Sequence, residues 1–489
     1  MIPQTTNGTA GTGGNAPRVP RGVPIAGHIP QWRKDPVRLL TDAARQADVV
    51  RLQLPGATYL VSHPSHVKHV LQDNNQNYIK GWVFNRIRPY WGQSLLTAEG
   101  EVWRQQRRRV QPSFKREHTT GFAPIVTART AEMLARWEKT ASDRGELSLY
   151  NEMTELALVI IGDILFGVDL WTDAKAMARA AQSALAVLKK RVAALAPLPL
   201  WVPTTDNRRF NNAMHLLHHR ISEIVERKRQ SEDPGETFLA MLMAARDTDT
   251  GAPMSDTQLH EEILGMLQQG HDTVGEALAW TWYLLSLHPE IEHKLHLEVA
   301  HAIGDRVPTV ADLPRLQYAH MILQESLRLY PPVWVIPRDA IKDDEIGGCR
   351  IPAKSTILLS PYITHRHPDF WENPEAFDPD RFLPARSHDR PRHAYFPFGG
   401  GPRLCMGVDM AMMEMMLIMV MVVQRFRLHL VSCHREEPEC ILDMIPRNRV
   451  RATLQRQQPI AGPSLAEAVG APAKCPVHAE TGDPFSAAL

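Results

Sequence analysis

The chain has 489 residues, is 44% hydrophobic and carries a formal net charge of +1. This length allows a large buried core, and the charge shows no basic or acidic excess that would indicate nucleic acid or an anionic surface as a partner. The five cysteines are sparse and form no close Cys-x-x-Cys pair, which argues against a disulfide framework or a zinc ribbon and favours a cytoplasmic location.

The N-terminal half is predicted to be mostly helical after a short irregular lead. Residues 1–16 are rich in Thr, Gly and Asn, lack the apolar core of a secretory signal and are predicted to be disordered. The proline-rich stretch 17–24 cannot be helical. Residues 49–61 alternate apolar and polar side chains around Pro55-Gly56, which predicts a small β-hairpin. Helical periodicity then predicts segments at 99–111, 119–140, 150–166, 173–194, 207–230 and 256–287.

The C-terminal half mixes helices with short strands. Ser255 or Asp256 can cap the 256–287 helix, and His288-Pro289 ends it. Residues 364–397 have no clear period, which is usual for a segment held by specific contacts. The remaining predicted elements are helices at 289–303, 314–330 and 407–427, strands within 333–360 turning at Gly347-Gly348, and short strands near 428–456.

The most apolar stretch runs from Met410 to Val423. It contains Glu414 and is shorter than the ~20 apolar residues of a membrane-spanning helix, so no transmembrane anchor is expected. A buried core helix, in which Met fills irregular gaps, is the better interpretation. We predict a single domain over residues 17–457, mainly α with a minor β part, followed by a mobile tail over 458–489.

The run Phe398-Gly399-Gly400-Gly401-Pro402-Arg403-Leu404-Cys405-Met406-Gly407 carries the strongest functional signal. Its glycines allow backbone conformations that other residues resist, and they let a flat ligand approach closely. Cys405 stands just before a predicted helix, whose dipole favours the thiolate. A thiolate there can bind a metal, and it is the haem ligand that favours O–O cleavage. The alternative is a buried, inert cysteine beside a glycine turn.

This run fills every fixed position of Phe-x-x-Gly-x-Arg-x-Cys-x-Gly and resembles the haem-ligand signature of the cytochromes P-450. The resemblance covers about residues 20–455 and implies their fold, a triangular helical prism with haem b between the long central helix and the Cys-loop helix. It implies that Cys405 is the axial iron ligand, that Phe398 packs near its sulfur and that Arg403 pairs with a haem propionate.

A second motif follows the family's order. Glu325 and Arg328 lie one turn apart on a predicted helix, which by itself indicates only a surface ion pair. The resemblance implies that this pair is buried and binds Arg381, within Phe377-Asp378-Pro379-Asp380-Arg381-Phe382. Its implied role is to support the haem pocket.

Gly270-His271-Asp272-Thr273 places poor helix formers in the middle of the long helix, which can be a tolerated irregularity. The resemblance implies instead that the helix opens there to admit dioxygen, that Thr273 hydrogen-bonds the bound oxygen and that Asp272 relays protons from solvent. Gln269 departs from the family's usual Ala or Gly. It could narrow the pocket or donate a hydrogen bond to the substrate.

Trp103 and Arg107 lie one turn apart and by themselves indicate a core aromatic and a solvated charge in the run Arg107-Arg108-Arg109. The resemblance implies that they bind a haem propionate and that Arg338 binds one as well. The basic surface of helix 99–111 is also a candidate docking face for an acidic electron donor.

The segments that the resemblance places around the substrate are nearly all apolar, although many of their residues could be ordinary core. Such a pocket predicts a hydrophobic substrate, for example a terpene, a fatty acyl chain or a polyketide. Residues 198–210 also resemble a connection found in the branch that oxidises fatty acids and terpenes. The candidate substrate contacts are Trp82, Phe84, Gln269, Val333, Val335, Met444 and Ile445.

The expected activity is monooxygenation, in which one atom of O2 enters the substrate and the other leaves as water. The sequence contains no nucleotide-binding glycine fingerprint and no flavin segment, so we expect a separate ferredoxin or flavodoxin, with its reductase, to supply electrons. A peroxygenase or isomerase that bypasses this donor, and a haem sensor without turnover, remain as alternatives.

Overall fold

The computed structural model describes residues 17, 22–143, 145–167, 171–194, 197–231, 235–247, 250–431 and 435–457. The predicted disordered segment 1–16 and the predicted tail 458–489 lie outside these residues. The chain divides into two compact units, each described by itself below; the single domain expected over 17–457 stays a prediction. Unit 1 comprises the residues up to Arg86, Val333–Ala376 and Asp389–Cys405, and unit 2 comprises Ile87–Pro332, Phe377–His388 and the residues from Met406.

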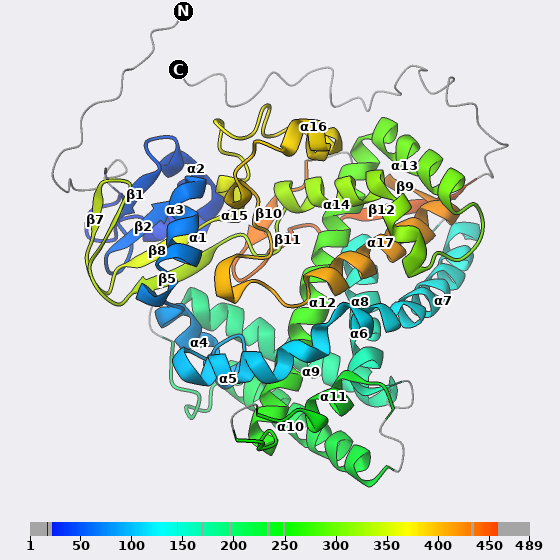
Figure 1. The fold of residues 1–489 in the computed structure, drawn as a ribbon, viewed down its shortest axis with the longest axis horizontal. Helices are drawn as coiled ribbons and strands as arrows, with labels where there is room; N and C mark the ends of the chain where they lie inside the picture. Colours follow the sequence, from blue (N-terminus) through cyan, green and yellow to red (C-terminus); the bar gives the residue numbers. More distant parts are fainter. Residues whose placement is uncertain are drawn as a thin grey trace, which may run out of the picture. The chain divides into compact units, whose positions relative to one another are not determined.

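Unit 1 contains a five-stranded sheet in the order β1-β2-β8-β5-β3 (Figure 1). β1 (Val49–Leu52) and β2 (Thr58–Val61) form the predicted antiparallel hairpin, with Val49 opposite Val61. β2 also pairs in parallel with β8 (Thr356–Leu359), and every residue of these two central strands is buried. Strands covered on both faces need nearly continuous apolar side chains, as both of these have.

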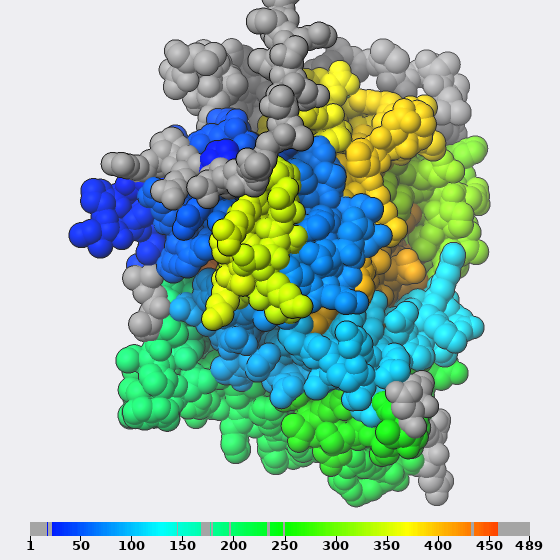
Figure 2. Space-filling view, turned by 60° about the vertical axis from the view of Figure 1, so that its left-hand side comes forward, coloured from blue at the N-terminus to red at the C-terminus, as the bar shows by residue number. Residues whose placement is uncertain are grey.

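The predicted turn at Gly347-Gly348 joins β6 (Asp344–Ile346) to β7 (Cys349–Ile351). Gly347 has a φ of +56°, and a Cβ there would lie 2.6 Å from the ring of His66 in α3 (Pro64–Lys68), so glycine is required. Figure 2 shows this hairpin in yellow-green against the blue N-terminal segments.

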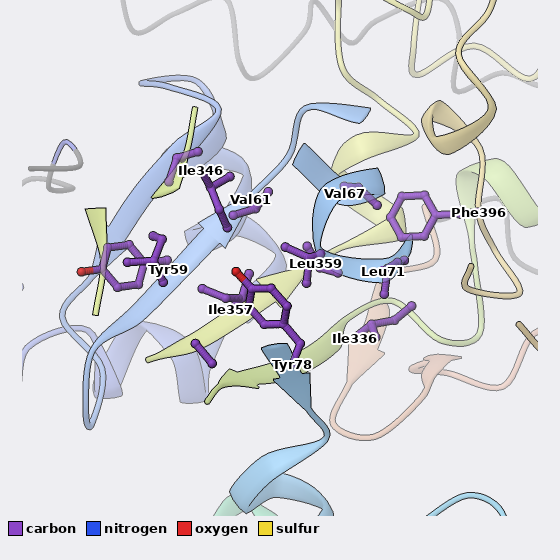
Figure 3. Close-up of a cluster of buried hydrophobic side chains, with 14 residues drawn as sticks. Tyr59, Val61, Val67, Leu71, Tyr78, Ile336, Ile346, Ile357, Leu359 and Phe396 are labelled. Carbon is purple, nitrogen blue, oxygen red and sulfur yellow. The ribbon is translucent and has the colours of Figure 1, made fainter. Parts of the chain in front are cut away.

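The core of unit 1 joins residues from distant parts of the sequence. Val67 and Leu71, from α3 and the π-helical turn η1 (His69–Asp73), pack with Ile357 and Phe396 (Figure 3). The other elements of this unit are α1 (Ile29–Lys34), α2 (Pro36–Ala44), η2 (Asn75–Asn77), β3 (Tyr78–Ile79), β5 (Ile336–Ala340), α15 (Pro361–Thr364), η7 (Arg392–Ala394) and η8 (Gly401–Arg403).

Unit 2 is helical and packs around α12 (Asp256–Leu287), the long green helix of Figure 1. The Ser255 hydroxyl accepts a hydrogen bond from the Gln258 N–H, which identifies Ser255 as the N-cap. Gly270 and Gly275 let α8 (Leu149–Phe166) approach α12 closely, since a Cβ at either position would lie 2.6 Å from an atom of α8.

α17 (Val408–Arg425) is the second buried helix of unit 2, and Met410–Val423 lies within it as predicted. None of the helices in the described parts of the chain is long and apolar enough to cross a membrane. The other helices of this unit are α5 (Gly100–Val110), η3 (Gln111–Phe114), α6 (Arg116–Gly121), α7 (Ala123–Ser142), α9 (Trp171–Ala193), α10 (Thr205–Gln230), α11 (Phe238–Ala244), α13 (Pro289–Ala302), η5 (Val310–Arg315), α14 (Gln317–Leu329), η6 (Pro379–Phe382) and α16 (Pro384–Ser387).

Two small sheets complete unit 2. β12 (Arg451–Arg456) pairs with β4 (Glu146–Ser148) and β9 (Phe426–Leu430), and β10 (Pro438–Cys440) forms a hairpin with β11 (Met444–Pro446). These strands confirm the predicted short strands near 428–456. A helix that is absent from the predicted elements is α4 (Gly81–Trp91), whose residues divide between unit 1 and unit 2.

Candidate functional site

The cysteine loop of unit 1 has a backbone that only its glycines allow. Gly399 and Gly401 have φ values of +75° and +62°, and a Cβ on Gly401 would overlap the carbonyl oxygen of Leu71 in η1. The Cys405 N–H donates to the carbonyl oxygen of Phe398 at 3.1 Å, which closes the loop between the two ends of the motif. The loop therefore holds Cys405 in one place, three residues before the start of α17.

Cys405 is exposed, so the alternative of a buried, inert thiol is wrong. Within the described residues, no group of three or more His, Cys, Asp or Glu side chains could hold a bare metal ion. An accessible thiol near a helix N-terminus fits an iron whose other ligands would come from a porphyrin. The loop therefore fits the thiolate-bound haem that the sequence predicts.

The residues predicted to bind propionates occur in both units. In unit 1, Arg403 is half-buried in the cysteine loop, and Arg338 is 8% exposed on β5, where it donates to the Pro337 carbonyl oxygen at 2.8 Å. In unit 2, Trp103 and Arg107 lie one turn apart on α5 and are half-buried. Their roles toward haem stay predictions.

α12 carries two stripes of polar side chains. Gln269 and Thr273 form an accessible stripe: Gln269 is exposed, and the Thr273 hydroxyl donates to the Gln269 carbonyl oxygen at 2.9 Å. The Gln269 amide donates to the Gly265 carbonyl oxygen at 3.1 Å and so lies back along the helix. The helix is unbroken over Asp256–Leu287, all of which is described, so the expected opening at Gly270 is not seen.

Asp272 lies on the second, buried stripe and is only 9% exposed. Its carboxylate accepts a hydrogen bond from the Gln268 side-chain amide, and the side-chain oxygen Oε1 of Gln268 in turn accepts one from the Tyr90 hydroxyl at 2.9 Å. His271 Nε2 lies 2.9 Å from Asp272 Oδ1 but off the direction of a hydrogen bond, so this contact is a charge pair. The Asp272 carboxylate therefore interacts with protein groups and has almost no direct contact with solvent.

The charges of this pair stabilise each other. Burial alone raises the pKa of Asp272, but His271, Lys189 and the hydrogen bond from Gln268 together outweigh burial, so the pKa lies below its ordinary value. Burial likewise lowers the pKa of His271, but the Asp272 carboxylate and the Leu267 carbonyl oxygen, with the more distant charge of Asp443, together outweigh burial and raise the pKa. Asp272 is therefore an ionised carboxylate at neutral pH and carries no proton of its own.

The predicted substrate contacts differ in accessibility. Trp82 and Val333 are exposed, Phe84, Val335 and Ile445 are half-buried, and Met444 is fully buried. Along β5 and the residues before it, burial alternates, so Val333 and Val335 lie on the opposite face from buried Trp334 and Ile336. Met444 is bound through its backbone to Trp280 and Pro332. The substrate role of each residue stays a prediction.

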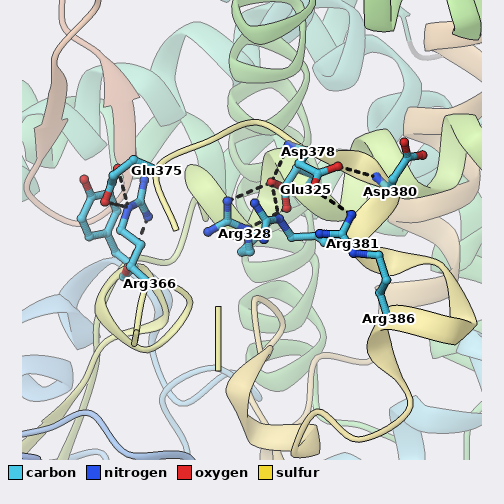
Figure 4. A network of polar contacts seen from close by, with 9 residues as sticks. Glu325, Arg328, Arg366, Glu375, Asp378, Asp380, Arg381 and Arg386 are labelled. Atoms are coloured by element: carbon cyan, nitrogen blue, oxygen red, sulfur yellow. Dashed lines mark hydrogen bonds and ion pairs between the residues drawn. The ribbon is translucent and has the colours of Figure 1, made fainter. Parts of the chain in front are cut away.

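The clamp predicted behind the haem pocket forms within unit 2 (Figure 4). Arg328 Nε lies 2.7 Å from the Glu325 carboxylate, and Arg381 Nε lies 2.9 Å from it, with all three side chains at most 3% exposed. The Asp378 N–H donates to Glu325 Oε1 at 2.9 Å. These bonds tie the meander at η6 to α14, and the interpretation as a surface ion pair is wrong.

The structure also shows polar partners that the sequence reasoning missed, namely Tyr90, Gln268 and His271 around Asp272. The spacing of Gln268, Asp272 and Glu276 at i, i+4 and i+8 in an apolar helix is a signal that could have indicated a buried polar stripe. Arg109 was expected to be solvated but is 12% exposed and pairs with Asp247 at 3.0 Å.

Comparisons with known proteins agree with this geometry. A family model described as cytochrome P450 matches residues 17–454. Cyclooctatin synthase of Streptomyces melanosporofaciens is 34% identical over 84% of this chain and 89% of that protein. Cyclooctat-9-en-7-ol 5-monooxygenase of the same organism is 33% identical over 84% of this chain and 88% of that protein. Pentalenene oxygenase of Streptomyces avermitilis is 29% identical over 90% of this chain and 97% of that protein.

Solved structures share the fold. The haem domain of cytochrome P450DA has a TM-score of 0.83 at 23% identity, over 92% of this chain and 99% of that one. Retinoic acid bound cyanobacterial CYP120A1 has a TM-score of 0.81 at 24% identity, over 91% of this chain and 100% of that one.

Proposed function

The chain belongs to the cytochrome P450 family of haem-thiolate monooxygenases, and we propose that it oxidises a terpene or a similarly apolar molecule with electrons from a separate redox protein. Haem bound through a thiolate activates dioxygen, so that one oxygen atom enters the substrate. The protein supplies the thiolate, the binding pocket and the protons.

Similarity to named oxygenases carries the proposal for the substrate. Two relatives are named for acting on cyclooctat-9-en-7-ol, which by its name is an alkene alcohol, and on pentalenene, which by its name is an alkene. The candidate contacts in this chain are mostly apolar, and Phe84, Val335 and Ile445 combine apolar side chains with partial exposure. Such side chains favour a ligand with few polar groups.

Within this function we assign Cys405 as the iron ligand, and Arg403, Arg338, Trp103 and Arg107 as partners of the haem propionates. Guanidinium groups form strong charge-assisted hydrogen bonds with carboxylates. Thr273 lies on the accessible stripe of α12 and would hold a proton at Oγ1 toward the reaction space. Asp272 would pass protons to it from the buried side of the same helix.

The proposed redox partner is a ferredoxin or flavodoxin with its reductase. Arg104 and Arg108 on α5 have side chains 56% and 44% exposed, and both contact Glu101. The exposed surface of α5 keeps a net positive charge even though Arg109 is withdrawn from it. A positive surface would speed the encounter with an acidic donor.

A ligand titration tests the substrate class. Purified protein is titrated with terpenes, fatty acids and polyketide lactones while the haem Soret band is followed. We expect saturable shifts with terpenes at lower concentrations than with the other classes. Tight binding of a strongly charged ligand, or of fatty acids only, would contradict the proposal.

Measurements of turnover separate the alternative activities. Turnover with peroxide alone, at the rate of donor-driven turnover, would favour the peroxygenase. Donor-dependent oxygen uptake that no bound ligand accelerates would favour the sensor.

A further inference from the structure

The buried stripe of α12 continues beyond Asp272 to Glu276, one helical turn further along. Glu276 is 0% exposed, and neither of its carboxyl oxygens has a hydrogen-bond partner within the described residues. An ionised carboxylate in such a place would be strongly destabilising, so the group needs either a partner or a proton.

Several contacts locate Glu276 within unit 2. The preceding residue, Gly275, packs against Thr154 of α8, and Tyr150 lies one turn before Thr154 on the same face of that helix. One turn after Glu276, the Trp280 Nε1–H donates to the Met444 carbonyl oxygen at 3.0 Å. Asp443, next to Met444, pairs with Lys189 of α9 at 3.4 Å. Glu276 is therefore surrounded by α8, α9 and the β10–β11 turn.

The charged groups that face Glu276 are Asp272 on its own helix, Lys189 on α9 and Asp443 on the turn, with the Tyr150 hydroxyl on α8 also within electrostatic reach. Asp272 and His271 form one pair of opposite charges, and Asp443 and Lys189 form a second. Together the two pairs have no net charge. Ionised Glu276 would add a negative charge that no group balances.

The direction in which the pKa of Glu276 shifts agrees with this count of charges. Burial, followed by the charges of Asp443 and Asp272, holds the pKa of Glu276 well above its ordinary value. Burial lowers the pKa of Lys189, but the surrounding acidic groups, Asp443 first among them, together outweigh burial, and the ammonium is retained. Glu276 is thus a neutral acid beside an ionised Asp272.

We propose that Glu276 is the proton store of this site: its neutral carboxyl supplies the proton that Asp272 passes on, and it is refilled through the Asp443–Lys189 pair. This inference rests on the proposed monooxygenase function of the chain. It assigns Glu276, Lys189 and Asp443 as positioning residues, which act through Asp272.

The proton balance is simple. The Thr273 O–H bond breaks as its proton enters the reaction space; in the same event Asp272 passes a proton to Thr273 Oγ1 and takes one from the breaking Glu276 O–H bond, so that Asp272 stays ionised and Glu276 is left ionised. Glu276 then takes a new proton from solvent by way of Asp443, which restores its neutral state. The side chains of Lys189 and Asp443 are 20% and 19% exposed, so this end of the path reaches accessible surface.

Infrared difference spectroscopy of the resting holoenzyme tests the store without turnover. Glu276→Gln keeps the shape of the side chain but has no acidic proton. We expect wild type minus Glu276→Gln at neutral pH to show the C=O stretch of a protonated carboxyl, shifted in D2O. Glu414→Gln is the matched control, because Glu414 is also buried and its burial raises the pKa of the carboxyl to about 8. Glu414 lies on a different helix, α17. This variant should lose a separate band. If Glu276→Gln loses no such band, the proposal is overturned.

Turnover then tests the delivery of the proton. Glu276→Gln should lower the rate of product formation roughly 10-fold, with KM unchanged, and should raise the solvent isotope effect and divert oxygen to peroxide. Glu276→Asp, which keeps an acid, should restore much of the rate, and Glu414→Gln should behave as wild type. The carbon monoxide spectrum and the melting temperature show whether each variant is folded and loaded with haem.

The two proposals fail in different ways. Active wild-type enzyme with a Glu276→Gln variant of normal rate and isotope effect would overturn the proton store alone. Wild-type protein without any donor-dependent turnover would overturn the proposed function, and the infrared band would still report whether Glu276 is protonated.

Discussion

At the scale of single residues, Cys405 and Glu414 show how position changes the chemistry of a side chain. Cys405 is exposed at the end of a loop that glycines shape, so its sulfur is open to a ligand. Glu414 lies nine residues later on buried α17, where burial raises the pKa of the carboxyl to about 8. Each leads to a prediction of its own.

Cys405→Ala should abolish the red-shifted Soret band that reduced, carbon monoxide-bound thiolate haem gives, because alanine supplies no ligand to the iron. Cys440→Ala, on β10, is the control and should keep the band. The absorption spectrum after reduction under carbon monoxide checks both variants. Persistence of the band in Cys405→Ala would disprove the assignment of the ligand.

Glu414→Gln should change how stability depends on pH. In the unfolded chain the carboxyl ionises near its ordinary pKa of 4.5, whereas in the folded protein it stays protonated to about pH 8. The raised pKa means that the carboxyl's contribution to the free energy of unfolding is full below pH 4.5 and is lost as pH rises to about 8, at about 1.4 kcal/mol per pH unit. The variant should lack this loss. Denaturant unfolding between these pH values measures it, and parallel curves for variant and wild type would refute it.

At the scale of elements, the contact between α8 and α12 positions the polar stripes of the site. Gly270 and Gly275 bring the two helices close together, with Ile161 and Thr154 packed against them. The Glu325 clamp has a similar role for η6, which it ties to α14 through charges that are almost fully buried. Removing one partner of such a network leaves an uncompensated buried charge, so the stability of the fold depends on the clamp being complete.

Gly275→Ala should destabilise the protein by about 1 to 3 kcal/mol, because its methyl group would lie 2.6 Å from Thr154 Cα and a backbone atom cannot easily move away. Gly121→Ala, at the end of α6, is the matched control, because a Cβ there meets nothing within 4 Å. Its effect should stay below about 1 kcal/mol. The two unfolding midpoints decide the question, and equal stability of both variants would show that α8 and α12 can separate at no cost.

At the scale of the whole molecule, a net charge of +1 hides a local excess on α5. Long-range attraction to an acidic partner depends on such local fields rather than on the total charge. The exposed side chains of Arg104 and Arg108 supply this field, while Arg109 pairs with Asp247 inside unit 2.

Arg104→Glu combined with Arg108→Glu should therefore slow reduction by an acidic ferredoxin and weaken the dependence of that rate on salt, since screening would have less attraction to remove. Arg38→Glu combined with Arg45→Glu, two exposed arginines that both contact Asp42 of α2, serves as the control with the same change of net charge. Stopped-flow reduction at several ionic strengths measures the effect. An unchanged salt dependence would remove α5 from the docking surface.

Much of the fold could be predicted because its signals are local. The helix expected at 256–287 is found at Asp256–Leu287, since Ser255 caps its start and His288-Pro289 stops its end within the same few residues. The hairpin at Pro55-Gly56 and the turn at Gly347-Gly348 follow from turn residues in the same way. By contrast, α4 was missed because its polar face and internal Pro89 obscure the helical period.

The sequence by itself determined the cysteine loop and the order of its supporting motifs, because these depend on residue types at short, set spacings. Only the tertiary structure decided that Cys405 is exposed, that Asp272 is ionised and held away from solvent, and that Glu276 has no partner within the described residues. The reason is the distance along the chain between the groups concerned. Tyr90 and Gln268 are separated by 178 positions, and Lys189 meets Asp443 only after the helices have packed, so no local pattern can report the charge that each group carries.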